Sequence, residues 1–426
     1  MASFTKLPTG RLGRLSSLAR VGARTGASML LSRDGSGAAE HAAQVLGSLR
    51  GLAAKVGQMA SYVDGVVPER HRDAYESALK GLRTAAPSSS PEAIRLQVEQ
   101  ELGAPIDQLF AEWDEQPMAS ASIGQVHRAR LHDGREVAVK AQHPGIDRAV
   151  ENDLKNASVL EHVVGMLGPR ALNSKQVYEE IAERFREELD YGLEAERQAM
   201  FRELMADEPH IHIPAVIAER SSRRVLTTEL CHGASFDDVT DADEPLRRHY
   251  CEVLWRFVYK GNLVGGVFNA DPHPGNYLFQ EDGTITFLDF GCVQPIPPDR
   301  LDKARALHRS AHRRDEETFR RVAVEILRTQ GGGYEQAVQD YVRRCFDPLF
   351  ERPFRITRDY VSEVVQGVYA MKEHVLPGGD HSFTPLPEGM VFMNRLQFGF
   401  YSVLARLDAE ADYAGVEMKL FEDAGL

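Results

Sequence analysis

Residues 270–276 read Ala-Asp-Pro-His-Pro-Gly-Asn and residues 289–291 read Asp-Phe-Gly, and this pair of motifs is the most informative part of the chain. Between the two motifs the sequence predicts two short strands joined by a turn. A hairpin of this kind would bring Asp271, Asn276 and Asp289 to one end. Phosphoryl transfer needs a carboxylate near the attacking hydroxyl and oxygen ligands that hold Mg²⁺ on the phosphates. The combined spacing therefore predicts a site for phosphoryl transfer.

A lysine lies upstream on a predicted strand. Residues 137–140 read Val-Ala-Val-Lys, so Lys140 has apolar neighbours and needs a phosphate or a carboxylate as its partner. The best carboxylate candidates lie in the acidic run 187–194, within a region predicted to be helical from Ile146 to Met205. One face of such a helix would carry Glu187, Asp190 and Glu194, with Glu188 beside them. An acidic helix face is usually solvated, so this run alone does not define a site.

Small residues precede the first strand of this region. Residues 118–125 read Met-Ala-Ser-Ala-Ser-Ile-Gly-Gln, where a loop that covers phosphates would lie. Small side chains let backbone N–H groups approach an anion closely, although an Ala-Ser loop is less free than a Gly-rich one. Without the other motifs, an ordinary loop that leads into the strand is the simpler interpretation. The runs 123–131 and 136–142 are of β type, and His132-Asp133-Gly134 between them predicts a hairpin.

Composition and charge disfavour several classes of function. The 426 residues are 43% hydrophobic and 27% charged, which is typical of a globular protein with a sizeable core. A formal net charge of −13 does not indicate a long basic groove, so no nucleic-acid partner is expected. The four cysteines are far apart, which favours free thiols over a disulfide framework or a structural zinc site. No apolar run approaches the roughly 20 residues of a membrane-spanning helix.

The N-terminal part of the chain begins with a basic segment. No acidic residue precedes Asp34, whereas six lysines and arginines do. Three interpretations stay open for this segment: contact with an anionic membrane surface, a transit peptide if the source is eukaryotic, or a mobile cationic tail. Further on, a linker rich in Ala, Pro and Ser precedes a helix predicted over 91–102, which Gly103 ends.

Together these motifs resemble the protein-kinase-like superfamily, and within it the atypical UbiB family, also called the ABC1 or AarF-domain kinase-like family. The resemblance covers residues 40–410 and rests on six elements in order. They are Lys-Val-Gly-Gln at 55–58, Ala-Ser-Ile-Gly-Gln-Val-His at 121–127, Lys140, Glu-Leu-Asp at 188–190, and the motifs at 270–276 and 289–291. Chance agreement of six ordered elements is negligible.

The resemblance implies an α+β, protein-kinase-like fold of two lobes with an N-terminal helical extension over the active site. The extension would carry Lys55 and Gln58 and would cover the place where a protein substrate lies in ordinary kinases, so protein kinase activity is not expected. The implied division is a basic tail over 1–35, the helical extension over 36–115, an N-lobe over 116–232 and a helical C-lobe over 233–426.

The resemblance also implies roles for individual residues. Lys140 would contact the phosphates of ATP or ADP, with Glu188 or Glu194 as its partner. Asn276 and Asp289 would bind Mg²⁺. The catalytic set would be Asp271, Lys140 and Lys55, and the remaining nucleotide-binding candidates are Ala119, Ser120, Ala121 and Ser122 in the loop, with Glu229 and Cys231 at a hinge after the strand 225–228.

The function that the resemblance implies is ATP hydrolysis, or transfer of the γ-phosphoryl group to a small or lipid-like acceptor, in support of ubiquinone or other isoprenoid lipid metabolism. Two alternatives stay open: a nucleotide-sensing scaffold without turnover, and a small-molecule phosphotransferase similar to aminoglycoside or choline kinases. The expected location is the cytoplasm, with peripheral contact at the inner membrane surface as an option, or the mitochondrion if the source is eukaryotic.

Some residues depart from the family pattern or lie outside it. Asn269 stands where many relatives have a histidine, two residues before the loop aspartate, which predicts altered packing of that loop. His308 and His312 are four residues apart on a predicted helix, but arginine neighbours predict a solvated face and not a metal site. His210 and His212 lack a third ligand at metal-binding spacing.

Overall fold

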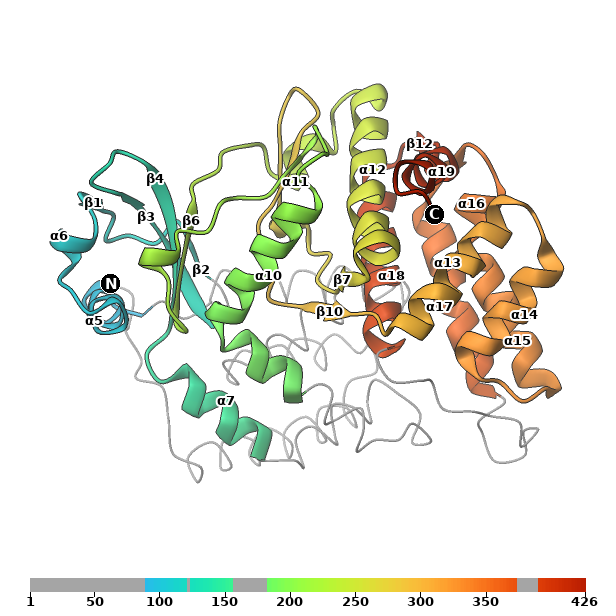
Figure 1. Ribbon diagram of the computed structural model, residues 1–426, viewed down its shortest axis with the longest axis horizontal. Coiled ribbons are helices and arrows are strands. Elements are labelled where there is room, and N and C mark those ends of the chain that lie inside the picture. The colour runs from blue at the N-terminus through green and yellow to red at the C-terminus, as the bar shows by residue number, and fades with distance from the viewer. Residues whose placement is uncertain (1–88, 121–122, 156–181, 374–389) are drawn as a thin grey trace, which may run out of the picture.

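The computed structural model describes residues 89–120, 123–155, 182–373 and 390–426. They form two lobes, one built around a five-stranded sheet and the other mostly of helices (Figure 1). Helix α10 (Tyr191–Leu204) lies between the two lobes, where it packs against strand β6 on one side and the helical turn η2 on the other. The predicted α+β class and its two lobes are confirmed.

Several predicted features lie outside the described residues. These are the basic tail over 1–35, the part of the extension that carries Lys55 and Gln58, and the loop residues Ala121 and Ser122. The boundaries placed at residues 35, 115 and 232 therefore stay predictions.

The N-lobe sheet is antiparallel, and its central pair is β3 (Gly124–Arg130) with β4 (Glu136–Gln142). The turn between them includes Gly134 at φ 90°, a backbone conformation that favours glycine. The hairpin predicted from His132-Asp133-Gly134 is thus confirmed. The other strands of the sheet are β1 (Glu112–Trp113) and β2 (Ala119–Ser120), which both pair with β3, and β6 (Val225–Glu229), which pairs with β4.

Helix α5 (Pro91–Leu102) covers one face of this sheet, with the short α6 (Ile106–Leu109) after it. The Ser90 side chain accepts a hydrogen bond from the Ala93 N–H at the start of α5, and Gly103 ends the helix at φ 73°. Ile94 and Val98 of α5 are fully buried against the valines of β4. The helix predicted over 91–102 is therefore confirmed.

The helical region predicted from Ile146 to Met205 is not continuous. Helix α7 covers Ile146–Lys155, a second helical stretch covers 182–188, and α10 begins only at Tyr191. Asp190 caps α10 because its side chain accepts hydrogen bonds from the N–H groups of the second and third helical residues. The prediction that Glu187, Asp190 and Glu194 share one helix face is therefore wrong.

The C-lobe surrounds a large apolar core in which Trp255, Phe400, Tyr401 and Tyr413 pack together. Its helices are α11 (Phe236–Val239), α12 (Glu244–Tyr259), the π-helical turn η2 (Lys260–Gly265), α13 (Pro298–His312), α14 (Glu316–Leu327), α15 (Gly332–Cys345), α16 (Asp347–Phe350), α17 (Arg358–Glu373), α18 (Met390–Leu407) and α19 (Tyr413–Asp423). A 3-10 turn covers Pro274–Asn276, and the short strands β11 (Phe354–Arg355) and β12 (Glu410–Ala411) pair antiparallel. Another 3-10 turn, at Ala218–Arg220, contacts β6 of the N-lobe.

Two small sheets carry the two motifs. Strands β8 (Tyr277–Phe279) and β9 (Ile285–Phe287) form the hairpin predicted between the motifs, and β5 (Ile211–His212) pairs parallel with β9. Strands β7 (Val267–Asn269) and β10 (Val293–Pro295) pair antiparallel beside them. The first motif therefore leaves β7 and enters β8, and the second leaves β9 and enters β10, which brings both to one place.

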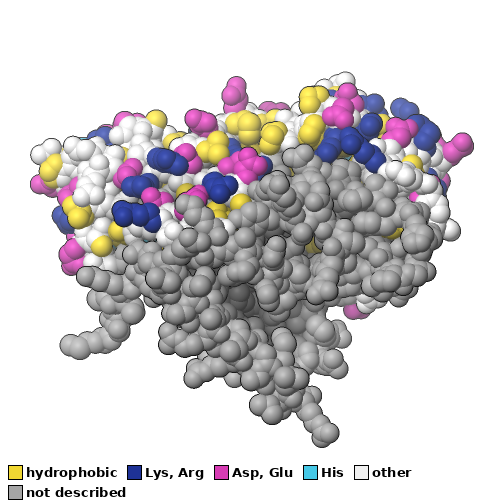
Figure 2. All heavy atoms as spheres, turned by 90° about the horizontal axis from the view of Figure 1, so that it is seen from below, with side chains coloured by type: hydrophobic (Ala, Val, Ile, Leu, Met, Phe, Trp, Pro, Cys, Tyr) yellow, Lys and Arg dark blue, Asp and Glu magenta, His cyan; other side chains and the backbone are white. Residues whose placement is uncertain are grey.

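The surface carries charges of both signs. On the face shown in Figure 2, basic and acidic side chains of the described residues lie next to one another. Many charged side chains of the described residues are paired, as in Arg343 with Glu316 at 3.0 Å and Arg344 with Glu363 at 2.8 Å. Across the described residues, none of the helices combines the length and the hydropathy that a membrane span requires.

Candidate active site

Three charged side chains from three elements meet between the lobes. Lys140 on β4 places its Nζ 2.7 and 2.9 Å from the two carboxylate oxygens of Glu194 on α10, and 3.4 Å from Oδ2 of Asp289 after β9. Burial alone would lower the pKa of the Lys140 ammonium, but the carboxylates of Asp289 and Glu194 outweigh it and raise that pKa well above its ordinary value. The site therefore holds a fixed cation between two acidic groups.

Of the two glutamates that the sequence left open, Glu194 makes the ion pair with Lys140. Its side chain is only 4% exposed, and it lies in the first turn of α10, where the helix dipole favours a carboxylate. Glu188 lies near the end of the preceding helical stretch and is also buried. Whether Glu188 contacts a nucleotide stays a prediction.

Tyr191 completes the surroundings of the lysine, and the sequence analysis missed it. Its ring lies 5.0 Å from the Lys140 Nζ and is fully buried, so the ammonium also rests on an aromatic face. Its hydroxyl oxygen would lie 2.8 Å from a Cβ at Gly124, which would also collide with the carbonyl oxygen of Ala141. Position 124 therefore needs a glycine. The one sequence signal for Tyr191 is its position directly after Asp190, the residue that caps α10.

The loop predicted to cover phosphates is described in part. Ala119 and Ser120 form β2, where both are exposed and pair with Val126 and Gln125 of β3. Ala121 and Ser122 lie outside the described residues. The described part of the loop is thus a strand paired with β3, and its role toward phosphate stays a prediction.

The first motif forms a compact loop in which Asp271 and Asn276 lie side by side. The Asn276 Nδ2 donates hydrogen bonds to the Asp271 carboxylate at 3.3 Å and to its backbone carbonyl at 3.2 Å. His273 accepts a hydrogen bond from the Gly275 N–H at 2.9 Å and so shapes the turn between them. The hairpin thus brings together the pair of oxygen-bearing side chains that the spacing predicts.

Asn269 joins the two motifs. Its Oδ1 accepts a hydrogen bond from the Asp271 N–H at 3.1 Å, and its Nδ2 donates one to the Asp289 carbonyl at 2.7 Å. An amide can accept and donate at once, so one side chain fixes the position of both aspartates. Asn269, whose departure from the family pattern predicts altered loop packing, therefore connects the first motif directly to the second.

The second motif is anchored to α10. Phe290 is fully buried, and its ring centroid lies 5.2 Å from that of Phe201 on α10. The Gly291 N–H donates a hydrogen bond to Asp289 Oδ1 at 2.9 Å. A Cβ at Gly291 would lie 3.3 Å from the same oxygen, which is tighter than an ordinary contact. The glycine therefore allows Asp289 to accept a backbone hydrogen bond beside Glu194.

Arg197 provides a second anchor that sequence analysis did not find. This α10 residue donates one hydrogen bond to the Gly291 carbonyl at 3.1 Å and another to Glu187 Oε2 at 2.6 Å. Arg184 donates to the same Glu187 oxygen at 2.6 Å. Glu187 therefore serves as the acceptor that holds Arg197 in place, although no helix face links it to Glu194.

Residues 230–233 carry the chain from the N-lobe sheet to the C-lobe. The Leu230 N–H donates a hydrogen bond to the Glu136 carbonyl in β4, and Ala234 pairs with Phe279 of β8. Glu229 and Cys231, the two hinge candidates, lie at the start of this connection and are both partly exposed. Burial raises the pKa of the Cys231 thiol to about 12, so the thiol is protonated at neutral pH.

The oxygen donors of the site match the preference of Mg²⁺, which binds carboxylate and amide oxygens. The Asn276 Nδ2 donates its hydrogen bond to Asp271, so the Oδ1 of Asn276 is the atom that would coordinate a cation. Asp289 offers a carboxylate oxygen on the side that faces Lys140. These two residues therefore fit a magnesium ion by their chemistry.

His308 and His312 correct another expectation. Both histidines contact one carboxylate oxygen of Glu417 on α19, at 2.6 Å from His308 Nδ1 and 2.9 Å from His312 Nε2. Glu417 is fully buried and the histidine side chains are each 9% exposed. The predicted solvated face is therefore wrong, because α19 covers the histidines of α13.

Comparison with known proteins gives a consistent result. The model of a family described as "ABC1 atypical kinase-like domain" matches residues 81–323, which is more than half of the chain. The chain is 27% identical to the mitochondrial atypical kinase COQ8B of Rattus norvegicus, over 95% of this chain and 79% of that protein. It is 30% identical to the chloroplastic protein ACTIVITY OF BC1 COMPLEX KINASE 7 of Arabidopsis thaliana, over 70% of this chain and 43% of that protein. The chain thus spans less than half the length of the Arabidopsis relative.

A solved structure also matches. It is the complex of Rv3197 with erythromycin from Mycobacterium tuberculosis, which superposes with a TM-score of 0.62 at 28% sequence identity. The match covers 88% of this chain and 93% of the mycobacterial chain. The similarity therefore extends over both lobes.

Proposed function

Because the chain belongs to the ABC1 atypical kinase-like family, we propose that it binds a magnesium–adenine nucleotide between its lobes and hydrolyses ATP or transfers the γ-phosphoryl group to a small or lipid-like acceptor. The family and the kinase-like α+β fold expected from the sequence are confirmed. Membership of a kinase-like family implies ATP-dependent activity, whereas the reaction and its acceptor are part of the proposal.

One observation carries the proposal. The cation of Lys140 is held at 2.7 Å from Glu194 and 3.4 Å from Asp289, beside a loop in which Asp271 contacts Asn276 at 3.3 Å. A lysine fixed by a glutamate on a helix presents its charge to phosphates, and an aspartate near the acceptor hydroxyl receives its proton. These groups come from both lobes, which matches a nucleotide bound between them.

Each residue has a defined part in this proposal. Lys140 would bind the phosphates, and Glu194 would keep its ammonium in place. Asp271 would orient the attacking water or hydroxyl and accept its proton as the γ-phosphoryl group leaves ADP. Asn276 and Asp289 would hold Mg²⁺, which neutralises charge on the phosphates when it is bound. Glu229 and Cys231 would lie beside the adenine.

The proposal extends to the acceptor and to the place in the cell. The resemblance favours an isoprenoid lipid, in line with ubiquinone or related metabolism, whereas the mycobacterial protein was solved in complex with erythromycin. The rat relative is named as mitochondrial and the Arabidopsis relative as chloroplastic. Peripheral membrane contact would run through the basic N-terminal segment, so anionic liposomes belong in the assay.

The test is ADP production from MgATP by the native protein and by Asp271→Asn, alone and with anionic liposomes that contain an isoprenoid phenol. We expect turnover to fall at least about a hundredfold in Asp271→Asn, because the carboxylate that receives the proton is lost. Mass spectrometry of the acceptor separates phosphoryl transfer from hydrolysis. Erythromycin serves as a second acceptor.

Two results would contradict the proposal. Equal ADP production by the native protein and Asp271→Asn would place the activity elsewhere or in a contaminant. Magnesium-dependent nucleotide binding with no turnover under any of these conditions would favour a nucleotide-sensing scaffold.

A further inference from the structure

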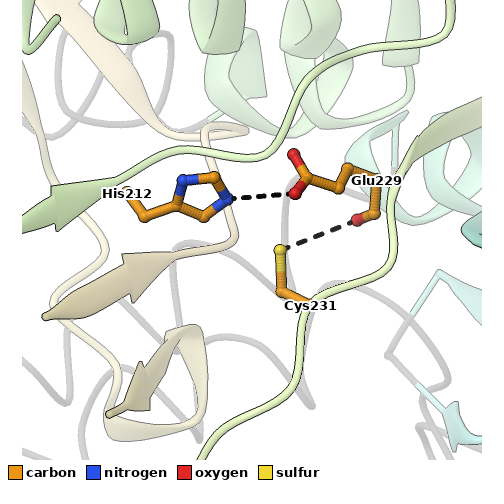
Figure 3. A group of neighbouring side chains, drawn as sticks. All are labelled: His212, Glu229 and Cys231. Carbon is orange, nitrogen blue, oxygen red and sulfur yellow. Dashed lines mark hydrogen bonds and ion pairs between the residues drawn. The ribbon is translucent and has the colours of Figure 1, made fainter. Parts of the chain in front are cut away.

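Three side chains with different donor atoms meet beside the hinge (Figure 3). His212 comes from β5 in the C-lobe, Glu229 is the last residue of β6 in the N-lobe, and Cys231 follows two residues later. One ligand atom from each lies within 4.8 Å of the other two. In the part of the chain that the structure describes, no other group of three His, Cys, Asp or Glu residues meets this condition.

The donor atoms are an imidazole nitrogen, a carboxylate oxygen and a sulfur. Mg²⁺ and Ca²⁺ select oxygen alone, whereas ions of the zinc class accept all three kinds of donor. Ligands at about 2.0–2.3 Å from a tetrahedral zinc lie roughly 3.3–3.8 Å from one another. The His212 Nε2 and the Glu229 Oε1 are already 3.4 Å apart. We propose that His212, Glu229 and Cys231 bind a divalent transition-metal ion, with Zn²⁺ as the best match, and leave a fourth position open.

The surrounding groups favour this arrangement. The Ala215 N–H donates a hydrogen bond at 3.2 Å to the second oxygen of Glu229, which turns the first toward His212. Metal binding would release the Cys231 thiol proton to solvent, so the carboxylate and the metal-bound thiolate would bring two negative charges to the ion. The positive charge of Arg202 lies close enough to Cys231 to lower the pKa of its thiol, against the larger effect of burial. The Arg202 guanidinium donates a hydrogen bond to the Ile213 carbonyl at 2.6 Å. Two anionic ligands outweigh that single positive charge.

The position of the site gives the ion a mechanical effect. His212 belongs to the β5–β9–β8 sheet of the C-lobe, whereas Glu229 belongs to the N-lobe sheet. A bound ion would therefore connect the two lobes and restrict their relative motion. It would also occupy Glu229 and Cys231, so it would weaken nucleotide binding, a consequence that rests on the proposed place of the adenine.

The chain contains four cysteines, and three of them, Cys251, Cys292 and Cys345, are buried in the C-lobe core. Cobalt is therefore a specific probe, because a cobalt–thiolate bond gives a charge-transfer band in the near ultraviolet that identifies a cysteine ligand. The experiment titrates the full-length protein with Co²⁺ alone, records that band, and then adds Zn²⁺ to displace the cobalt. Four variants are compared: His212→Ala, Glu229→Gln, Cys231→Ser and His232→Ala.

We expect one cobalt per chain, with a charge-transfer band that Zn²⁺ abolishes and that Cys231→Ser lacks. His212→Ala and Glu229→Gln should weaken cobalt binding at least about tenfold, because the first removes a ligand and the second replaces an anionic ligand by a neutral amide. His232→Ala is the matched control, since this histidine is adjacent to Cys231 but its side chain is 74% exposed and outside the cluster. It should bind cobalt as the native protein does.

The absence of a charge-transfer band, or a band that persists in Cys231→Ser, would overturn the proposal. Circular dichroism of each variant separates a lost ligand from a lost fold, and His212 and Glu229 are both partly exposed, so these changes should be tolerated.

A second measurement separates this inference from the proposed function. The stabilisation of the native protein by MgATP should decrease when Zn²⁺ is present, and His212→Ala should keep its MgATP stabilisation with or without Zn²⁺. If cobalt binds at Cys231 but MgATP does not stabilise the native protein, the nucleotide proposal is contradicted and the metal site still holds. If MgATP stabilises the native protein but cobalt does not bind at Cys231, the metal site is contradicted and the nucleotide proposal still holds.

Discussion

Glu194 holds the ammonium of Lys140 with both carboxylate oxygens, and the two side chains are 4% and 19% exposed. Removal of Glu194 leaves Asp289, 3.4 Å from the Lys140 Nζ, as the carboxylate that balances the buried ammonium, and a weakened buried ion pair is costly in a protein interior. The replacement Glu194→Gln should therefore lower the free energy of unfolding by about 2 kcal/mol and reduce the affinity for MgATP. Urea unfolding and a nucleotide titration measure the two effects.

The matched control is Glu196→Gln, because Glu196 lies on the same helix but is exposed. It should change neither quantity measurably. Equal effects of the two replacements would show that the loss of any negative charge from α10 is responsible, and would contradict a specific role for Glu194.

Asn269 connects the backbone around Asp271 with that of Asp289 through two hydrogen bonds. Asn269→Ala should lower kcat for ATP turnover about tenfold and leave KM within about twofold, because misplaced catalytic groups slow the chemical step more than binding. Asn269→His, which introduces the residue that the family resemblance leads us to expect at this position, should retain more activity than alanine. Steady-state kinetics of the three proteins test this. A rise in KM with constant kcat would assign Asn269 to binding.

The candidate-site residues that belong to spaced motifs are predictable from the sequence. The hairpin spacing predicts that Asp271, Asn276 and Asp289 lie at one end, whereas Lys140 joins them only through the family resemblance. The sequence does not reveal the partners that only tertiary packing brings near. The sequence shows no third ligand for His212, yet Glu229 at the end of β6 and Cys231 just after it approach that histidine in the structure.

At the scale of elements, the contact of α13 with α19 depends on a buried carboxylate. Burial alone would raise the pKa of Glu417, but His308 and His312 outweigh it and lower that pKa to about 2. The folded state therefore binds this proton less tightly than the unfolded state, whose glutamates have a pKa near 4.3. The stabilisation is present above about pH 4.5 and is lost as the pH falls toward 2.

From pH 5.5 to pH 3.5 this group should remove about 1 kcal/mol of unfolding free energy. Glu417→Gln should be less stable than the native protein at pH 5.5 and should lack that part of the pH dependence. Urea unfolding followed by fluorescence is suitable, because Trp255 is buried 4.5 Å from the ring of Tyr413 on α19. The control Glu422→Gln changes an exposed residue of α19 and should behave as the native protein. An unchanged pH profile in Glu417→Gln would contradict the assignment.

Elements with strong local signals were predicted with correct boundaries or nearly so. The helix over 91–102 and the β3–β4 hairpin have their own caps and turn residues. The sequence does not show that the helix is interrupted before α10, because an aspartate is common both on a helix surface and at a helix cap. Tertiary contacts decide which of the two positions Asp190 takes. Two-residue strands such as β5 and β1 are too short to show a periodic pattern in the sequence. They are defined by their hydrogen bonds to neighbouring strands, β9 and β3.

At the scale of the whole molecule, α10 and the hinge at 230–233 connect two lobes whose charged residues face one another. The central claim is that this convergence binds a magnesium–nucleotide complex. A ligand that binds only the folded state stabilises it by about 3 kcal/mol at a hundred times its Kd, so thermal unfolding reports binding directly. The extension with Lys55 and Gln58 lies outside the described residues and enters this claim only through the family resemblance.

The most direct measurement is the thermal unfolding midpoint of the native protein, Asp289→Asn and Asp282→Asn, each with MgATP, MgADP, or nucleotide with excess EDTA. Asp282 lies exposed in the β8–β9 turn and serves as the control. We predict a magnesium-dependent rise of the midpoint in the native protein and in Asp282→Asn, and none in Asp289→Asn. A native midpoint that neither nucleotide raises, or an equal rise in Asp289→Asn, would contradict the account.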